Sequence, residues 1–421
     1  MDIDPAKLGK RLRDAREACG LTQEEVAQRL GVSRSTVAQM EAGSRLVEEH
    51  ELSLLAYLYG RDARSFFASA RGDGGGALTA LFRVHPDLAT AEPTREALRR
   101  AVALGRELTR VERMLGAPRR LAIVASYALP RPSGTWEAVV QGEQLAHDER
   151  RRLGLGLAPL PDVAELLERQ GVRTGLIELP EDVSGLTVEA EDLGVLVLVN
   201  RGESSLRRRF SFAHEYCHVL VDRRRQSLVS ARSKRREHLE VRANAFAAAF
   251  LMPREAVVRF LQAHGKGGPR RALVEAFDED GIFQARARSA PRSQDIHLVD
   301  VVLLANYFGV SRAAACYRLK SLRIITEHQL RELLEMDKAG SGSLFERLLG
   351  LDTAEERDTG ERLGRRFLEP AFEAYRRGAI SRRKLYEIAE LAEVPRADVD
   401  EAIFLWGLDP ANDRRPRPPE D

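Results

Sequence analysis

Two histidines and a glutamate in one short segment, HEYCH at residues 214–218, have the types and the spacing of a metal-binding catalytic helix. In an α-helix, positions i and i+4 lie on the same face, so His214 and His218 can present two imidazoles to one tetrahedral zinc ion. Glu215 would then lie beside the metal, where it can act as general base on a water molecule. With nine histidines in 421 residues, a chance match has a probability on the order of one per cent, so the context of the motif matters.

The residues around the motif are apolar. They are Phe210, Phe212, Ala213, Val219 and Leu220. A helix with this pattern buries one side in a core instead of being solvated all round. The context therefore favours a helix that lies beneath a cleft.

A third metal ligand is needed, because a catalytic zinc ion usually has three protein ligands and a water molecule. The segment REHLEVRANAFAAAFLMP, residues 236–253, offers Glu237, His238 and Glu240. Glu240 and Asn244 are one helical turn apart on the apolar side of this segment, so Asn244 can orient a ligating histidine. We therefore expect Glu240 to be the third ligand, with Glu237 and His238 as alternatives.

These two segments carry a family resemblance. RRRFSFAHEYCHVLVDR followed by LEVRANAFAAAFLMP resembles the ImmA/IrrE family of zinc metallopeptidases, whose pattern is HExxH and then E-x-x-A-N-x-F-A-x-x-x-L-M-P. The resemblance extends over roughly residues 137–325 and 360–406. It implies a gluzincin-like endopeptidase with one zinc ion per chain, in which His214, His218 and Glu240 are ligands and Glu215 is the general base.

One position departs from the commonest form of the family. The residue before Ala243 is often acidic there and is Arg242 in this chain; the spacing to Asn244 favours Glu240 as the ligand. Cys217, inside the motif, is expected to be a small buried residue. His238 is expected at the surface and His297 in a structural role.

A second resemblance lies near the N-terminus. LTQEEVAQRLGVSRSTVAQMEAGSR, residues 21–45, has capping residues Thr22 and Ser33 before two helices and Gly31 in the turn between them. It resembles the Cro/C1-type (XRE) helix-turn-helix family, and the match covers about residues 7–67. The expected core consists of Val26, Ala27, Leu30, Val37 and Met40.

The helix-turn-helix resemblance implies duplex DNA as a partner. In its docking geometry the second helix enters the major groove. The residues expected at base edges are Arg34, Ser35, Thr36 and Gln39, and those expected at phosphates are Gln23 and Arg45. Two alternatives stay open: the module makes protein contacts only, or it recognises a similar module in a substrate.

The remaining pattern predicts a multidomain, mostly α protein, because 421 residues exceed one ordinary core. We expect an all-α helix-turn-helix domain, a central α+β zincin-like metallopeptidase and a C-terminal helical domain. The expected segments are a DNA-binding domain 1–70, a Gly-rich linker with connecting helices 71–130, the peptidase core 131–291, a helix-turn-helix-like extension 292–350, a C-terminal helical segment 351–412 and a disordered tail 413–421. RTGLIEL and LGVLVLVN predict strands, whereas 265–293 is expected to be a loop.

Two features bear on assembly. The helix expected over 94–115 has an apolar seam that would fit either a homodimer contact or packing on the next domain, and we favour the packing. The segment LLANYFGVSRAAACYRLKSL, residues 303–322, repeats the turn letters GVSR, and 379–404 does so more weakly. We interpret both as helices that pack beside the peptidase, with a second DNA contact through Arg312, Arg318 and Lys320 as the alternative.

Composition and charge limit the expected class of protein and its cellular compartment. A net charge of +2 excludes a uniformly basic nucleic-acid coat, and three cysteines far apart in sequence suit a reducing compartment. The N-terminus has no apolar signal segment, and no stretch is long and apolar enough to span a membrane. We expect a cytoplasmic protein, associated with the nucleoid when bound to DNA.

Together the two resemblances predict a zinc endopeptidase fused to a sequence-specific DNA-binding domain. By likeness to the family, its substrate would be a transcription regulator, specifically a helix-turn-helix repressor. The response would be to stress, DNA damage, a mobile element or phage. The alternative is an XRE-type transcription regulator whose peptidase-like domain serves as a sensor or dimerisation module with little proteolysis; the presence of Glu215 favours the enzyme.

Overall fold

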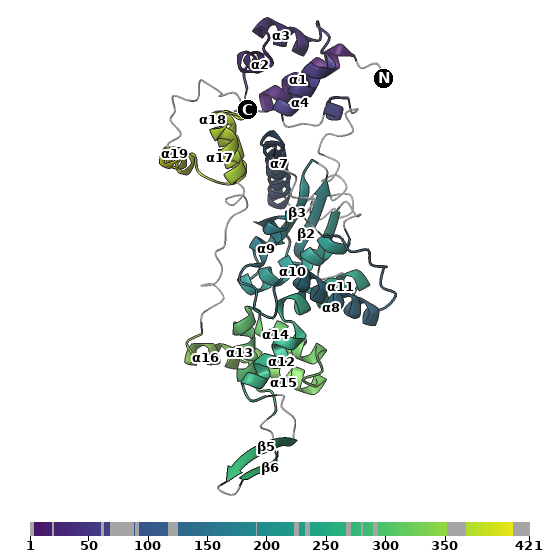
Figure 1. Cartoon of the computed structure of the whole chain (residues 1–421), viewed down its shortest axis with the longest axis vertical. Coiled ribbons are helices and arrows are strands. Elements are labelled where there is room, and N and C mark those ends of the chain that lie inside the picture. The colour runs from purple at the N-terminus through teal and green to yellow at the C-terminus, as the bar shows by residue number, and fades with distance from the viewer. Residues whose placement is uncertain are drawn as a thin grey trace.

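The computed structural model describes most of the chain. The described residues are 4–18, 21–59, 63–67, 88, 92–116, 125–190, 192–222, 227–231, 236–266, 271–278, 281–288, 294–351 and 368–406. The expected linker 71–76, the expected helix end at Gly20 and the expected tail 413–421 lie outside them. Figure 1 shows the N-terminal helices at one end and the strand pair β5–β6 at the other.

The N-terminal part is a helical bundle. It consists of α1 (Pro5–Ala18), α2 (Gln23–Leu30), α3 (Arg34–Ala42), α4 (Glu49–Leu58) and the short 3-10 helix η1 (Ala63–Phe66). Thr22 and Ser33 cap α2 and α3 as expected, and Gly31 has φ of 70° in the turn between them. Of the expected core, Leu30 is half-buried and the other four residues are buried.

The central sheet has four strands in the order β1-β3-β2-β4. They are β1 (Arg173–Ile177), β2 (Val183–Ala190), β3 (Gly194–Asn200) and β4 (Ser227–Ala231). β1 is parallel to β3, and the other two pairings are antiparallel. The two strands expected from the sequence are β1 and β3, and the sheet adds β2 and β4 to them.

The two faces of this sheet belong to two different hydrophobic cores. Leu196 and Leu198 of β3 join a core with α7 (Glu92–Met114), while Val197 and its neighbours on the other face join a core with α10 (Ser205–Val221). Because strand side chains alternate between faces, β3 is buried on both sides. The apolar seam of α7 therefore packs on the sheet of its own chain, as favoured from the sequence.

Helices on the α10 side complete the central domain. They are α8 (Thr135–Arg152), α9 (Val163–Arg169), α11 (His238–Leu251) and α12 (Arg254–Ala263). α8 and α11 pack closely at Gly142, where an added Cβ would lie 2.4 Å from the backbone oxygen of Arg242. Only glycine permits this approach, which fixes α8 against α11, and α11 in turn packs on α10.

The segment expected as a loop at 265–293 is not a loop throughout. It contains an antiparallel pair, β5 (Arg271–Asp278) and β6 (Gly281–Arg288), in which Arg271 is opposite Arg288. The prediction was wrong because the arginine-rich composition was given more weight than the alternation of RALVEAFD and GIFQARAR.

Helices make up the described remainder of the chain. They are α13 (Leu298–Phe308), α14 (Arg312–Ser321), α15 (Glu327–Lys338), α16 (Ser341–Leu348), α17 (Leu368–Arg376), α18 (Arg382–Leu391) and α19 (Arg396–Leu405). The α13–α16 group shares the core of α10 and α11, whereas the α17–α19 group shares that of α7. Figure 1 shows these two groups on different sides of the central domain.

No single helix in the described ranges is both long and apolar enough to cross a membrane. The pair α13 and α14 passes that test only when taken together, across a bend of 104°.

Candidate metal centre

The HEYCH segment lies in α10, as the sequence predicts. This helix runs between the sheet and α11, and every residue from Ser211 to Leu220 is buried. His214 and His218 lie one turn apart with their ring centroids 5.1 Å from each other. Helix periodicity has thus placed two imidazoles on the same side of α10, inside the protein.

Glu240 of α11 meets the two histidines. Its carboxylate oxygens lie 3.2 Å from Nε2 of His214 and 3.5 Å from Nε2 of His218. The three ligand atoms lie within 4.8 Å of one another, and all three residues are buried. Glu237 and His238, the alternatives for the third position, are outside this group.

The other ring nitrogen of each histidine is held by an oxygen acceptor. Nδ1 of His214 lies 3.0 Å from Oδ1 of Asn244, and Nδ1 of His218 lies 2.8 Å from Oδ2 of Asp222. Since these oxygens accept hydrogen bonds, each Nδ1 carries a proton and donates it. In the neutral form of each imidazole, Nε2 then has the lone pair that a metal ion would bind, the arrangement found where a partner orients a ligating histidine.

The donor set fits zinc. Ligand atoms about 2.0–2.2 Å from a tetrahedral ion are about 3.3–3.6 Å apart, close to the 3.2 and 3.5 Å separations of Nε2 and carboxylate oxygen. Both Nε2 atoms are buried and have no hydrogen-bond partner. Two imidazoles and a carboxylate are also ligands that zinc prefers.

The electrostatics of the cluster favour a positive charge. Burial lowers the pKa of His218, but the carboxylates of Asp222 and Glu240 outweigh it and raise that pKa to about 10. Burial raises the pKa of Glu240, but His214 and His218 hold it well below its ordinary value. Glu240 therefore stays ionised, as a metal ligand must.

Glu215 lies against the sheet. Its Oε2 accepts a hydrogen bond of 2.7 Å from the hydroxyl of Thr187 on β2, while its Oε1 is buried without a partner. Gly185 of the same strand makes room for it, because a Cβ there would lie 3.0 Å from that Oε1. One oxygen of Glu215 is thus anchored and the other is free to take a proton.

Arg242, which departs from the family pattern, is not in the His–His–Glu group. Its side chain is buried, and its Nη2 donates to both oxygens of Asp222 at 2.9 Å. Its Nη1 donates to Gln141 of α8 at 3.3 Å. Asp222 was not among the residues predicted from the sequence, although its position four residues after His218 is a signal for contact along one helix.

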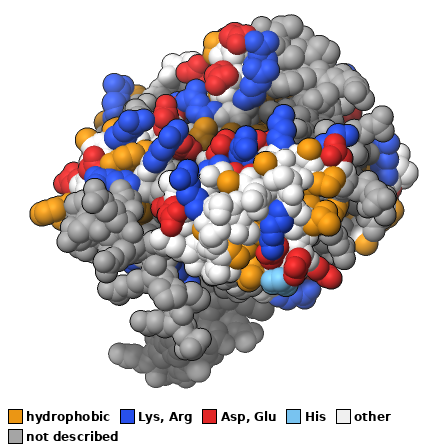
Figure 2. Space-filling view, turned by 90° about the horizontal axis from the view of Figure 1, so that it is seen from above, with side chains coloured by type: hydrophobic (Ala, Val, Ile, Leu, Met, Phe, Trp, Pro, Cys, Tyr) orange, Lys and Arg blue, Asp and Glu red, His pale blue; other side chains and the backbone are white. Residues whose placement is uncertain are grey.

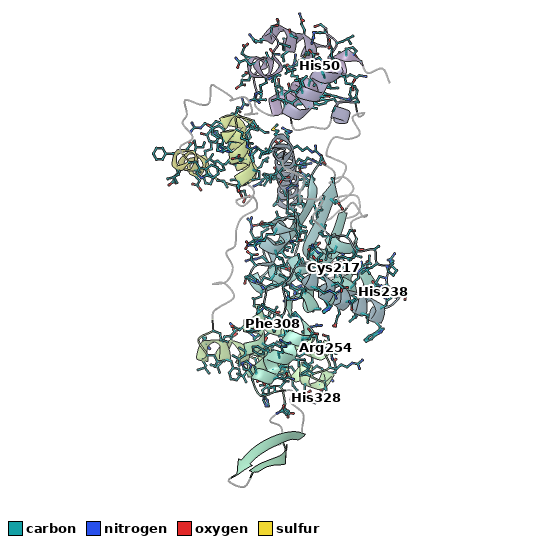
Figure 3. All side chains as sticks on the ribbon, in the orientation of Figure 1. His50, Cys217, His238, Arg254, Phe308 and His328 are labelled. Carbon is teal, nitrogen blue, oxygen red and sulfur yellow. The ribbon has the colours of Figure 1, made fainter. Side chains whose placement is uncertain are left out.

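The other candidates lie outside the His–His–Glu group, and His238, expected at the surface, is half-buried. Cys217 is fully buried, and burial raises the pKa of its thiol. Nδ1 of His238 lies 3.2 Å from the backbone oxygen of Pro132, and His297 caps α13. Figure 3 labels Cys217 in the central domain and His238 to one side of it.

The N-terminal bundle presents part of its expected DNA face. Arg34, Ser35 and Gln39 are exposed and Thr36 is half-buried. The amide of Gln23 donates to Glu41 at 3.0 Å, and the guanidinium of Arg45 holds Glu51 through two bonds of 2.9 and 3.0 Å. Figure 2, which views the molecule from this end, shows Lys and Arg side chains interspersed with acidic ones.

Fold and site together define a chain that joins a DNA-binding type of helical module to a metallopeptidase-like domain. Comparison with known families agrees: residues 7–65 match the family model described as a helix-turn-helix domain, and residues 167–268 match the IrrE N-terminal-like domain. The second range contains the HEYCH segment, Glu240 and Asn244. No curated protein matches the chain. Both resemblances found in the sequence are confirmed over these residues, and the chain contains a helix-turn-helix domain followed by an IrrE-like peptidase domain.

Proposed function

We propose that the protein is a zinc-dependent endopeptidase that cleaves a protein substrate and binds duplex DNA through its N-terminal domain. The observation that supports this most strongly is the meeting of His214, His218 and Glu240, with both Nε2 atoms free of hydrogen bonds. Glu215, the candidate general base, follows His214 directly in α10. The match to the IrrE N-terminal-like domain gives independent support.

His214 and His218, through Nε2, and Glu240, through its carboxylate, are the residues that would hold one zinc ion. Zinc, when bound, would polarise the scissile carbonyl and make a water molecule more acidic. Oε1 of Glu215 would take a proton from the attacking water as the water oxygen bonds to the carbonyl carbon, and would return that proton to the amine nitrogen as the C–N bond breaks. Thr187 keeps Oε2 fixed during both transfers, which holds the base in one orientation.

The DNA-binding part of the proposal rests on α3. Arg34, Ser35, Thr36 and Gln39 would contact base edges, and Gln23 and Arg45 would contact phosphates. In the structure Gln23 and Arg45 are held by Glu41 and Glu51, so their contacts with phosphate would require those bonds to be shared or exchanged. We propose a helix-turn-helix repressor as the substrate, on the strength of the family resemblance.

The test is the metal content of purified full-length protein by inductively coupled plasma mass spectrometry. Wild type should contain about one zinc ion per chain, and His214→Ala and Glu240→Ala should contain far less. Glu215→Gln should retain the metal, because Glu215 is not a ligand in this proposal, and can then serve as an inactive trap for substrate. A wild-type protein without zinc, after purification without chelator and with zinc supplied, would remove the protease from consideration.

A regulator with little proteolysis is the second candidate, and one observation favours it. Glu215 has no exposed surface and His218 is 1% exposed, so a peptide reaches the base only after a local opening. The two candidates differ in one measurement. The enzyme yields cleaved products that disappear with Glu215→Gln, whereas the regulator binds its DNA and leaves every candidate repressor intact.

A further inference from the structure

The geometry points to Asp222 and Arg242 as a positioning pair that holds His218 in the orientation and tautomer that a metal ion requires. This inference rests on the proposed zinc site, because it concerns how one ligand of that site is presented. Neither residue belongs to the His–His–Glu group. Both would act on the metal through His218.

The pair is built from two helices. Asp222 is the residue at the C-terminal end of α10, and its backbone N–H donates to the carbonyl of His218 at 2.8 Å while its Oδ2 accepts from Nδ1 of the same residue at 2.8 Å. Arg242 comes from α11, two residues after Glu240. The ion pair of Asp222 with Arg242 therefore links the two helices that supply the ligands.

Arg242 restricts what the carboxylate of Asp222 can do. Its Nη2 lies 2.9 Å from both carboxylate oxygens, and its side chain is only 1% exposed. A carboxylate held on two oxygens by a buried guanidinium cannot rotate freely. Oδ2 is thereby fixed as the acceptor for His218, so the free Nε2 points at Glu240.

The charges are arranged to suit a cation at the ligands. Asp222 and Glu240 contact the histidines directly, and the charge of Glu215 also acts on His218. Arg242 pairs with Asp222, which neutralises the carboxylate that orients His218. Glu240 faces the two imidazoles instead, so its negative charge remains for the metal.

The experiment measures zinc dissociation constants of the full-length protein by competition with a chromophoric chelator, using zinc alone as the probe. The variants are Asp222→Ala, Arg242→Met, the double variant and Asp222→Asn. Loss of a residue that orients a ligating histidine typically weakens metal binding about 10- to 100-fold. We expect that loss in Asp222→Ala, a smaller loss in Arg242→Met and a loss at the lower end of the range in Asp222→Asn, which keeps an oxygen acceptor.

The double variant distinguishes positioning from a merely structural ion pair. If Arg242 acts only through Asp222, the double variant binds zinc as Asp222→Ala does, within about twofold. If the fold-losses of zinc affinity in the two single variants multiply in the double variant, Arg242 does not act through Asp222, and the proposal is contradicted. Zinc binding by folded Asp222→Ala within about twofold of wild type would overturn the proposal, whatever its melting temperature.

Glu149 offers a matched control on the opposite side of α10. It is a fully buried carboxylate that accepts hydrogen bonds from Tyr216 of α10, from Tyr127 and from Arg152. Glu149→Gln should lower the melting temperature and leave the zinc affinity unchanged. An equal loss of zinc affinity in Glu149→Gln would show that any weakening of the contacts around α10 lowers the zinc affinity. It would overturn the specific role of Asp222 and Arg242.

Failure of this inference is distinguishable from failure of the proposed function. Wild type that binds one zinc ion while Asp222→Ala binds equally well contradicts the positioning pair alone. Wild type that binds no zinc contradicts the proposed function, and the inference with it. Melting of each metal-free variant is recorded first, and if Asp222→Ala is unfolded, Asp222→Asn replaces it in the same comparison.

Discussion

The pairs α2–α3 and α13–α14 have the same turn and different surroundings. Gly31 and Gly309 have φ of 70° and 63°, and each is followed by a valine and by a serine that caps the second helix. The side chains of Ser33 and Ser311 each accept a bond of 3.1 Å from the backbone three residues on. The letters GVSR therefore specify one local geometry in both places.

The difference lies in what covers the second helix. Arg34 of α3 is exposed, whereas its counterpart Arg312 of α14 is held by Asp337 and Glu346 at 2.5 Å each. Met40 of α3 lies in the apolar core, whereas its counterpart Arg318 is buried and donates to the carbonyl of Met252 and to Glu143. The turn sequence thus indicates a helix pair, and the neighbours of the second helix decide whether its arginines are available to a nucleic acid.

The largest expected effect concerns Arg318. Replacing it with methionine leaves a buried carbonyl and the partly exposed carboxylate of Glu143 without their donor, so the free energy of unfolding should fall by about 3 kcal/mol. Chemical denaturation measures this. Arg34→Met is the matched control on the α2–α3 pair, and its free energy of unfolding should stay within about 0.5 kcal/mol of wild type. Equal losses of stability in the two variants would contradict the difference between the two helix pairs.

The next effect is on DNA. Arg34→Ala should weaken binding to a duplex selected by the wild-type protein from a random pool by about 1–3 kcal/mol, because we propose that this arginine contacts a base edge. Fluorescence anisotropy at fixed salt gives the affinity. Arg312→Ala should leave it unchanged, and a comparable loss there would mean that α14 contacts DNA as well.

The turn glycines should respond alike. An alanine at a left-handed position costs about 1–2 kcal/mol, so Gly31→Ala and Gly309→Ala should each lower the free energy of unfolding by that amount. At Gly31 no atom would meet the added Cβ, and at Gly309 the nearest is the end of the Arg209 side chain at 3.4 Å. Thermal unfolding of both variants tests this; a cost confined to one of them would show that the turns are not equivalent.

The smallest effect is at the caps. Ser33→Ala and Ser311→Ala each remove one hydrogen bond to the second helix and should cost about 1 kcal/mol. Denaturant midpoints resolve this difference. Of these two variants only Ser33→Ala should also weaken DNA binding, because Arg34 of α3 is exposed whereas Arg312 of α14 is held in ion pairs.

The sequence was sufficient for the parts of the site that depend on local spacing. His214, His218 and Glu215 follow from helix periodicity, and Glu240 with Asn244 follows from the same rule applied to the next motif. The structure brings His214, His218 and Glu240 together and places Asn244 on His214. Their roles in binding and catalysis remain predictions.

Contacts between elements far apart in the sequence could not be predicted in this way. Thr187 meets Glu215 only because β2 lies in the sheet beneath α10, and Arg242 meets Asp222 only because α11 packs beside α10. The same holds for β2 and β4, whose pairing depends on the whole sheet. No periodicity within a single segment contains this information.

Strand β2 has a consequence for how this protein can vary. The hydroxyl of Thr187 donates a hydrogen bond to Glu215 on one face of the strand. Its neighbours Leu186 and Val188 belong to the core of α7 on the other face. Three consecutive positions therefore have two separate requirements: support of the candidate base Glu215 on one face and packing against α7 on the other. A redesign of the α7 interface at positions 186 and 188 therefore also changes the strand that holds the candidate general base Glu215, and such variants should be tested for zinc binding as well as for folding.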